Sequence, residues 1–395
     1  MTLDVVIVGA SAGGLAVAEG LRRRGFTGSV ALVDAEPELP YDRPPLSKQV
    51  LDGRWAPERT RLRTPAELDA LGVDLLLGRR AAALDVRRHH LILGDGGVLG
   101  YRTLVLAPGL HARRLPGRRD LAGVHTLRTL GDSLALRADL LSARRVVVVG
   151  AGVLGCEVAA TARGLGREVT LVEPAARPML RLLGPELGAE IARLHEDQGV
   201  RLLTSTPVAG LVGEAGRAVG VRTVSGAVLP ADVVVVAVGG RPATDWLAGS
   251  GLALDDGVAC DDHCRAAEDV YAVGDAARFG AGGCGGRRGV RLENRTNATE
   301  QGLFVAAHVL GAAPGPYDPL PYVWTDQFRV RIQVYGSVPE GSAVRIVEGS
   351  VPDRKFVAHV ETDGRLVGVV GWNSPGRTRT ARALLAASAS TTFPR

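Results

Sequence analysis

Two glycine-rich segments of the same kind occur in this chain, each where an apolar run would lead into a helix. The first, Gly9–Gly14, follows residues 3–8, and the second, Gly150–Gly155, follows residues 145–149. A glycine-rich turn at the start of a helix offers free backbone N–H groups and the positive end of the helix dipole, and both attract a pyrophosphate. Two such turns in strand–turn–helix context predict two bound dinucleotides, with electrons moving between them.

The two segments differ at one position. Ser11 replaces the middle glycine of the first, and serine is small enough to let a phosphate approach the backbone. The second, with Gly152 in the middle, has the complete pattern. The residues predicted from these patterns to bind dinucleotides are Gly9, Ser11, Ala12, Gly13 and Gly14 in the first segment, and Gly150, Gly152, Val153, Leu154 and Gly155 in the second.

Acidic residues follow both segments at the distance expected for ribose recognition. Asp34 and Glu36 end the second strand of the first unit, and Glu173 ends the matching strand of the second. A carboxylate there accepts hydrogen bonds from ribose hydroxyls and repels a 2′-phosphate, so the second unit is predicted to prefer NADH to NADPH. Arg177 argues the other way, because an arginine in this region accommodates the 2′-phosphate.

A lysine lies between the two segments. Of the 47 lysines and arginines, only Lys48 and Lys355 are lysines, and Lys48 follows a rigid Pro-Pro segment. A lysine beside an isoalloxazine ring stabilises the negative charge that develops as the ring takes a hydride. Glu157 is the expected counter-ion of Lys48 and a contact for the nicotinamide amide. The alternative for Lys48 is a solvated surface side chain.

The elements that position these residues repeat along the chain. A strand, a helix and a second strand are predicted in each unit, and the segments 101–110 and 232–241 resemble each other. A helix is predicted over 297–310, and the glycine-rich stretch 280–289 is predicted to be a mobile loop tip.

The C-terminal part has a different pattern. Alternating runs at 329–335, 355–361 and 366–372, with an Asp363-Gly364 turn, predict an antiparallel meander. Ser374-Pro375 is predicted to begin a last helix.

Composition limits the possible classes of protein. The chain has 395 residues, 46% of them hydrophobic and 23% charged, as expected for a globular protein of two or three domains. Its apolar runs are far shorter than the roughly 18 residues of a membrane span. Met1 leads almost directly into the first strand, which leaves no room for a signal peptide, and there are four cysteines. We therefore expect a cytoplasmic protein, with no membrane association.

The charge pattern limits the possible partners. A net charge of +5 suits an acidic protein partner. Aromatic residues make up 4% of the chain, and no basic stripe contains interleaved aromatics, so nucleic acid is not an expected partner.

Four motifs together resemble one family. The strings Tyr41–Lys48, Val273–Arg278, Glu293–Leu303 and Val323–Arg329 are similar to those of the oxygenase-coupled NADH-dependent ferredoxin reductases, which include putidaredoxin, rubredoxin and biphenyl-dioxygenase ferredoxin reductases. The resemblance implies an α/β, glutathione-reductase-like fold with two Rossmann-type domains and a C-terminal α+β interface domain. The implied parts are an FAD domain in two segments (1–110 and 241–320), an NAD domain (111–240) and the interface domain (321–395).

The resemblance also assigns further site residues. It places Lys48 and Glu157 by the flavin ring and the nicotinamide, where they are the predicted catalytic residues. The further residues it implies are Arg43, Lys48, Ala82, Arg128, Asp275 and Arg295 for FAD, and Gly239 for NAD. This chain departs from the family at two places: Arg295 stands where a tryptophan often covers the flavin, and Pro108 replaces a threonine. Neither change removes a group that hydride transfer requires.

Cysteine positions separate the neighbouring families. Disulfide reductases and related peroxidases of this fold need cysteine soon after the second strand, and residues 40–51 contain none. Cys260 and Cys264 are spaced too loosely for a metal site and are predicted to lie in a surface strand–turn, so no metal is expected.

The sequence therefore predicts that electrons leave FAD for an acceptor outside the chain. The expected acceptor is an acidic iron–sulfur ferredoxin that docks near the flavin and supplies an oxygenase, expected to be a haem monooxygenase. One alternative is an NADH oxidase or diaphorase that reduces oxygen or quinones directly. Another is an NADH-responsive flavoprotein that acts as an interaction switch. A monomer and a homodimer are both compatible with the sequence.

Overall fold

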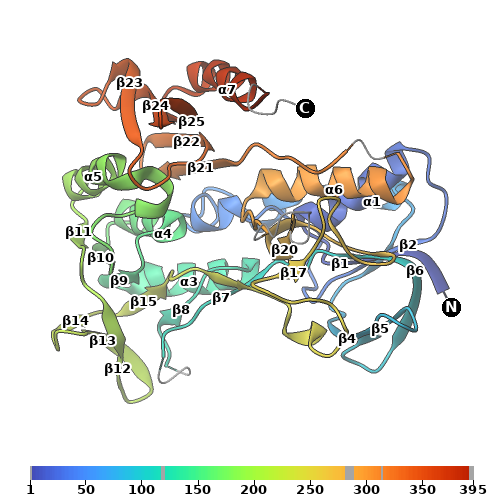
Figure 1. Ribbon diagram of the computed structural model, residues 1–395. Coiled ribbons are helices and arrows are strands. Elements are labelled where there is room, and N and C mark those ends of the chain that lie inside the picture. Colours follow the sequence, from blue (N-terminus) through green and yellow to red (C-terminus); the bar gives the residue numbers. More distant parts are fainter. Residues whose placement is uncertain (1, 117–120, 281–288, 313–314, 391–395) are drawn as a thin grey trace. The chain divides into compact units, whose positions relative to one another are not determined.

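The computed structural model describes residues 2–116, 121–280, 289–312 and 315–390, with side chains as far as residue 385. Its internal contacts divide the chain into two compact units. Figure 1 labels their helices and strands. The first unit consists of Met1–Asp42, Glu58–His111 and Gly240–Pro319, and the second of Arg43–Pro57, Ala112–Gly239 and Leu320–Arg395. The predicted glycine-rich stretch 280–289, with Cys284, lies almost wholly outside the described residues.

The first unit is built on an eight-stranded sheet whose centre is parallel. Its central strands are almost continuously apolar and buried, as expected for a parallel sheet covered on both faces. In sheet order the main path is β18 (Arg265–Ala267), β19 (Val270–Ala272), β6 (Val98–Leu106), β1 (Thr2–Val8), β2 (Val30–Val33) and β3 (Asp74–Leu76), with β5 (His90–Leu93) joining β6 and β4 (Ala81–Asp85) joining β5.

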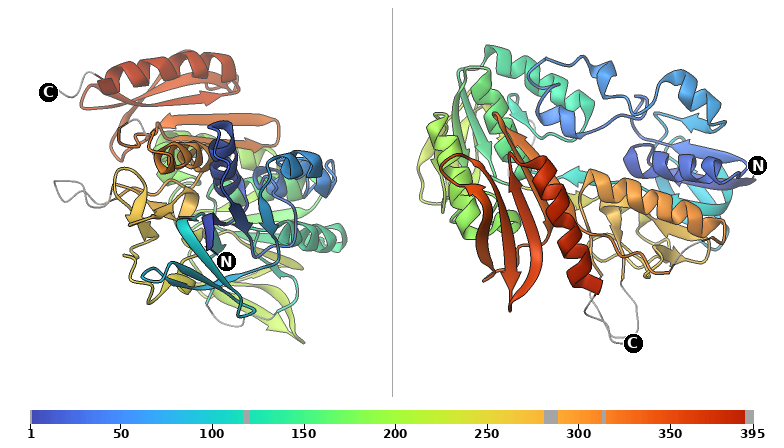
Figure 2. Two further views of the ribbon diagram at one scale, coloured as in Figure 1. Left: turned by 90° about the vertical axis from the view of Figure 1, so that its right-hand side faces the viewer. Right: turned by 90° about the horizontal axis from the view of Figure 1, so that it is seen from above.

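Two helices of the first unit pack side by side, α1 (Ala12–Arg23) and α6 (Arg295–Val309) (Figures 1 and 2). A Cβ at Gly302 would lie 2.5 Å from the carbonyl oxygen of Gly13, so glycine is required for this close approach. The other short elements of this part of the chain are η2 (Pro57–Thr60), α2 (Pro65–Ala70), β7 (Leu110–Ala112), β16 (Gly240–Pro242), η3 (Asp245–Leu247), β17 (Val258–Ala259), η4 (Gly274–Ala276) and β20 (Ala277–Arg278).

The second unit contains its own parallel sheet of five strands. The glycine-rich turn follows the central strand, as it does in the first unit. The strands in order are β11 (Arg201–Leu203), β10 (Glu168–Val172), β9 (Arg145–Val149), β15 (Val233–Val236) and β8 (Val124–His125), and the helices are η1 (Pro44–Ser47), α3 (Leu130–Ser142), α4 (Val153–Gly164) and α5 (Leu180–Asp197). A separate antiparallel sheet consists of β12 (Val208–Glu214), β13 (Arg217–Thr223) and β14 (Val228–Pro230).

The last sheet of the second unit is antiparallel and has α7 (Pro375–Ser390) packed against it (Figure 2). The expected final helix does begin at Pro375. The expected hairpin is also present, because Asp363 (φ 51°) and Gly364 (φ 72°) both adopt the positive φ angles of a two-residue turn. The strands in sheet order are β21 (Tyr322–Gln327), β22 (Val330–Gly336), β25 (Arg365–Trp372), β24 (Lys355–Thr362) and β23 (Ala343–Ser350).

The prediction of a simple meander is wrong, because β25 lies between β22 and β24. Val369, Val370 and Trp372 of β25 are fully buried, whereas most side chains of β23 are exposed or half-buried. The strand with the most buried side chains therefore takes the centre of the sheet, and the exposed strand takes an edge. The predicted α/β class, with two parallel sheets and a C-terminal α+β part, is confirmed. The domain boundaries stay a prediction.

Candidate functional site

The first glycine-rich turn joins β1 to α1. Gly9 has a φ of 101°, and a Cβ there would lie 2.1 Å from the carbonyl oxygen of Ala107. A Cβ at Gly14 would lie 1.8 Å from the carbonyl oxygen of Gly9. Ser11 is the N-cap of α1, but its side chain does not cap the helix. The N–H groups of the first helical turn thus lack a side-chain cap, and the turn fits a bound diphosphate.

The second turn, between β9 and α4, repeats this geometry. Gly150 has a φ of 100°, and a Cβ at Gly155 would lie 1.8 Å from the carbonyl oxygen of Gly150. Gly152 is the N-cap of α4 with a φ of −73°, and a Cβ there would have nothing within 4 Å. Glycine therefore serves a different physical purpose at each position. Gly150 adopts a left-handed backbone, Gly155 allows close helix packing, and Gly152 leaves the approach to the turn open.

Both turns are braced by a carboxylate in the same way. Asp34 Oδ2 accepts a hydrogen bond from the Ala10 amide at 2.6 Å, and Glu173 Oε2 accepts one from the Ala151 amide at 2.6 Å. The other oxygen of each carboxylate accepts from the amide two residues further along. A carboxylate has about four acceptor positions, so each still has room for a ribose hydroxyl.

The remaining predicted residues of the first unit lie on separate elements. The Glu36 carboxylate accepts a hydrogen bond from the Tyr41 hydroxyl. Asp275 lies in η4, whose backbone is tied to α6 because the Gly274 amide donates to Gln301 Oε1 at 2.7 Å. Ala82 lies on β4 with an exposed side chain.

Arg295, the departure from the family pattern, begins α6. Its Nε lies 2.8 Å from Asp42 Oδ1, and its guanidinium also donates to the Thr299 hydroxyl. An ion pair therefore occupies the position for which the family resemblance implies an aromatic ring. Gly13, at the start of α1, lies close to Ala298 of α6, so Arg295 and the first turn are parts of one packed region.

Lys48 is buried in the second unit and is not a solvated surface lysine. Only 8% of Lys48 is exposed, and its Nζ lies 2.8 Å from Oε1 of Glu157, which is 5% exposed. Ser47 donates to Glu157 Oε2 at 2.6 Å, and its own carbonyl accepts from the Thr161 hydroxyl at 2.7 Å. The Pro-Pro segment forms η1, which is thereby fixed to α4 by side chains on both elements.

The predicted arginines of the second unit support the same segment. Arg43 Nη1 donates to the Arg128 carbonyl at 2.7 Å, and the Arg128 amide donates to Asp132 in the first turn of α3. Ser133 of α3 donates to the Leu46 carbonyl of η1 at 2.7 Å.

The predicted NAD residues include two in the first turn of α4 and one beyond β15. Val153 and Leu154 begin α4. Gly239 has a φ of 92°, a conformation that favours glycine.

The sequence patterns assign no role to three buried residues of this site. Thr325 donates to Glu157 Oε1 at 2.8 Å, Gln327 Nε2 lies 3.2 Å from Thr325 Oγ1, and His195 Nε2 lies 2.9 Å from Gln327 Oε1. A usable signal was present, because Thr325 and Gln327 alternate along one strand and so face the same side. No sequence pattern connects His195, on α5, to them.

The described cysteines are buried. Burial raises the pKa of Cys156 and Cys260 above the ordinary thiol value, and it raises the pKa of Cys264 to about 12. Cys260 and Cys264 flank a turn as expected, but both are buried, so their predicted place on the surface is wrong. Within the described ranges, no group of three or more His, Cys, Asp or Glu side chains is arranged to hold a metal ion.

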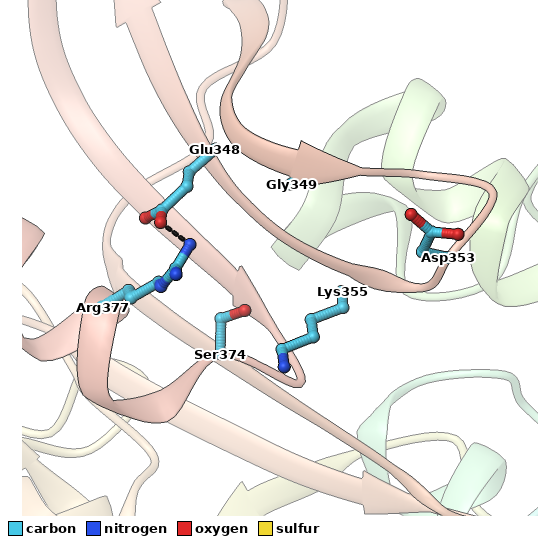
Figure 3. Close-up of a pocket in the computed structure, with 6 residues that line it drawn as sticks. All are labelled: Glu348, Gly349, Asp353, Lys355, Ser374 and Arg377. Carbon is cyan, nitrogen blue, oxygen red and sulfur yellow. Dashed lines mark ion pairs between the residues drawn. The ribbon is translucent and has the colours of Figure 1, made fainter.

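A pocket of about 400 Å³ lies on the C-terminal sheet (Figure 3). Glu348 and Arg377 form an ion pair at its edge. Its lining contains none of the predicted site residues: it consists of Glu348, Gly349, Asp353, Lys355, Ser374 and Arg377. Among the described helices, none combines the length and the apolar character needed to cross a bilayer.

Comparison with known proteins extends these observations to the whole chain. Residues 3–302 match the pyridine nucleotide-disulphide oxidoreductase family, and residues 322–394 match the reductase C-terminal family. A rhodocoxin reductase from Rhodococcus erythropolis is 36% identical over 386 residues, which are 97% of this chain and 90% of that protein.

Two solved structures are similar in fold over nearly their full length. One is the ferredoxin reductase for the CYP199A2 system from Rhodopseudomonas palustris (TM-score 0.91, 35% identity, 96% of this chain and 93% of that one). The other is a covalent putidaredoxin reductase–putidaredoxin complex (TM-score 0.91, 34% identity, 98% and 93%). The chain belongs to the pyridine nucleotide-disulphide oxidoreductase family and, within it, to the ferredoxin reductases, enzymes that use FAD and a nicotinamide dinucleotide.

Proposed function

We propose that this enzyme takes electrons from NADH and delivers them to a small iron–sulfur ferredoxin that supplies an oxygenase. The observation that carries the proposal is a pair of dinucleotide turns in a chain with no cysteine in residues 40–51. When bound, FAD accepts a hydride from a nicotinamide and releases its electrons singly. With no thiol in that segment to receive them, the electrons pass to an acceptor outside the chain.

The two turns have different cofactors in this proposal. The first, with Asp34 and Glu36 at the following strand end, holds FAD, and the second, with Glu173, holds NADH. Glu173 is fixed by two backbone amides, so its negative charge stays beside the second turn. A 2′-phosphate in that place would be repelled, which supports NADH as the donor rather than NADPH.

Lys48 and Glu157 are the proposed catalytic pair. The Lys48 ammonium stabilises negative charge that develops as the flavin is reduced. Glu157 balances the charge of Lys48 in a buried place, where an unpaired cation would be costly. Its Oε2 has one described donor, Ser47, so an acceptor position remains for the nicotinamide amide.

The finer identity of the partner is also part of the proposal. An acidic ferredoxin suits the net charge of +5, and exposed arginines such as Arg329 are candidates for steering it to a docking place near the flavin. The relatives named rhodocoxin reductase and putidaredoxin reductase support a carrier protein as the acceptor. We propose a haem monooxygenase as the oxygenase, and the relatives named as components of dioxygenase systems support a dioxygenase as the alternative. We propose a cytoplasmic enzyme that works as a monomer or a homodimer.

Stopped-flow spectroscopy of the FAD-loaded enzyme tests this function. NADH should bleach the flavin rapidly, and reoxidation should be fast with an acidic iron–sulfur ferredoxin and slow with oxygen alone. Rapid turnover with oxygen alone would reject the proposal in favour of an NADH oxidase. A long-lived charge-transfer band with NADH-dependent dimerisation, and no reduction of the ferredoxin, would instead identify an interaction switch.

A further inference from the structure

A hydrogen-bonded network of buried polar side chains ends on the Glu157 carboxylate, which forms an ion pair with Lys48. It runs from His195 on α5 through Gln327 and Thr325 on β21 to Glu157 on α4. His195 and Gln327 are fully buried, and Thr325 is 1% exposed. All these elements belong to the second unit.

The hydrogen bonds of this network all run in one direction, from His195 toward Glu157. Gln327 Nε2 donates to Thr325 Oγ1 and also lies 3.3 Å from Met179 Sδ, which leaves Gln327 Oε1 to accept from His195 Nε2. His195 Nδ1 has no partner among the described residues. When the imidazole proton is on Nε2, Nδ1 is an unpaired acceptor. The opposite tautomer would bury an unpaired N–H donor, which proteins avoid.

Every donor of this network therefore points toward Glu157. Thr325 accepts a hydrogen bond from Gln327 and donates one to Glu157 Oε1, the same oxygen that contacts Lys48. Burial lowers the pKa of His195 to about 4, so the imidazole is neutral at physiological pH and adds no charge to this network.

Among the described contacts, β21 supplies the only anchors of Glu157 outside α4, η1 and Lys48. Ser47 and Lys48 both reach the carboxylate from η1 or the residue that follows it. Thr325, with the Asp326 amide at 3.4 Å, reaches it from β21. Without Thr325, Oε1 would keep only Lys48 and the longer contact to the Asp326 amide, so the carboxylate would be held less firmly toward β21 and would turn more readily toward Lys48.

We infer that Thr325, Gln327 and His195 are positioning residues that fix the Glu157 carboxylate and thereby limit its hold on Lys48. Apolar side chains of the same size would fill the space without the cost of burying polar groups. The inference rests on the proposed function of Lys48 for its effect on flavin reduction, but not for its effect on Lys48 itself.

The scarcity of lysine allows a direct test. Lysine labelled with ¹³C and ¹⁵N gives signals from two side chains, Lys48 and Lys355, and the Lys355→Arg variant assigns them. The probe variant is Thr325→Val, which keeps the shape and removes the hydroxyl. The matched control is Thr325→Ser, which restores the hydroxyl.

In the FAD-loaded enzyme, Thr325→Val and Gln327→Met should shift the Lys48 signal and slow flavin reduction about tenfold, the size of one lost hydrogen bond of about 1–1.5 kcal/mol. The affinity for ADP-ribose, which lacks the nicotinamide that Glu157 is proposed to contact, should stay unchanged. Thr325→Ser should bring the Lys48 signal back to its wild-type position, which also excludes an effect of general destabilisation.

The two possible failures can be told apart. A wild-type Lys48 signal in folded Thr325→Val would overturn the positioning role. A shifted Lys48 signal with an unchanged reduction rate would support the positioning role and would overturn the catalytic role proposed for Lys48, and Lys48→Met should then also reduce normally.

Discussion

A substitution at Gly152, in the second turn, should weaken dinucleotide binding without disturbing the fold. Gly152→Ala adds a methyl group at an ordinary φ of −73° with no protein atom within 4 Å. We therefore expect the free energy of unfolding to change by about 0.5 kcal/mol or less. The same methyl group points to the open approach that a pyrophosphate would use.

The size of the effect follows from the cost of crowding. Forcing one methyl group into a closely packed contact costs about 1–3 kcal/mol. The dissociation constant for NADH should rise by about 5- to 150-fold, since each 1.4 kcal/mol is a factor of ten. Isothermal titration with NAD⁺ and with ADP-ribose measures this without turnover, and thermal unfolding and FAD content are measured on the same samples.

Two further variants make the result interpretable. Gly155→Ala should unfold or lose stability, because its Cβ would lie 1.8 Å from the Gly150 carbonyl oxygen. Gly152→Ser copies Ser11, which occupies the matching N-cap position of the first turn. Unchanged ADP-ribose affinity in folded Gly152→Ala would refute the assignment of this turn to the pyrophosphate. Loss of FAD instead of NADH would show that the two cofactors had been assigned to the wrong turns.

Four other outcomes are expected. Lys48→Met should slow flavin reduction by about 10²- to 10³-fold with FAD retained, since one charge-stabilising donor is lost; an unchanged stopped-flow rate would remove its catalytic role. Glu173→Ala should erode the preference for NADH, measured as the ratio of kcat/KM values, and a wild type that prefers NADPH would contradict the assignment. Arg295→Trp should leave Asp42 without its ion pair and change nicotinamide affinity or ferredoxin reduction; an effect on stability alone would make Arg295 structural. Burial lowers the pKa of His195 from 6.5 to about 4, so between these values the unfolded chain binds a proton that the folded chain does not, and the free energy of unfolding should fall by about 3 kcal/mol as the pH falls through this window. Urea unfolding across that range checks this, and His195→Asn should lack that part of the slope.

The parts of the site that depend on neighbouring residues could be predicted from the sequence. The turns at Gly9 and Gly150 are set by local backbone conformation and follow apolar strands, so their pattern is visible in a short window. The hairpin at Asp363-Gly364 is predictable for the same reason. The ion pair of Lys48 with Glu157 joins residues far apart in the chain, and its expectation rests on Glu157 lying just inside the helix that follows the second turn.

The parts that depend on tertiary packing could not be predicted. The order of the C-terminal strands is decided by which strand buries both faces, and alternation alone does not show this for β25. The contact of His195 with Gln327 needs α5 to lie against β21. A fully buried histidine without a charged partner has no signature in sequence, because histidine is common both inside proteins and on their surfaces.

The likeness of the two turns has a consequence for how cofactor choice can change. Their first glycines differ in φ by one degree, at 101° and 100°, and their carboxylates hold the next amide at the same 2.6 Å. In the proposed function, phosphate recognition would therefore depend on backbone conformation that both units share, whereas the choice of nucleotide would depend on side chains beyond the turns. Redesign toward another dinucleotide should leave the glycines untouched and vary the residues that follow β2 and β10, where the two units differ: Asp34 in the first and Glu173 in the second.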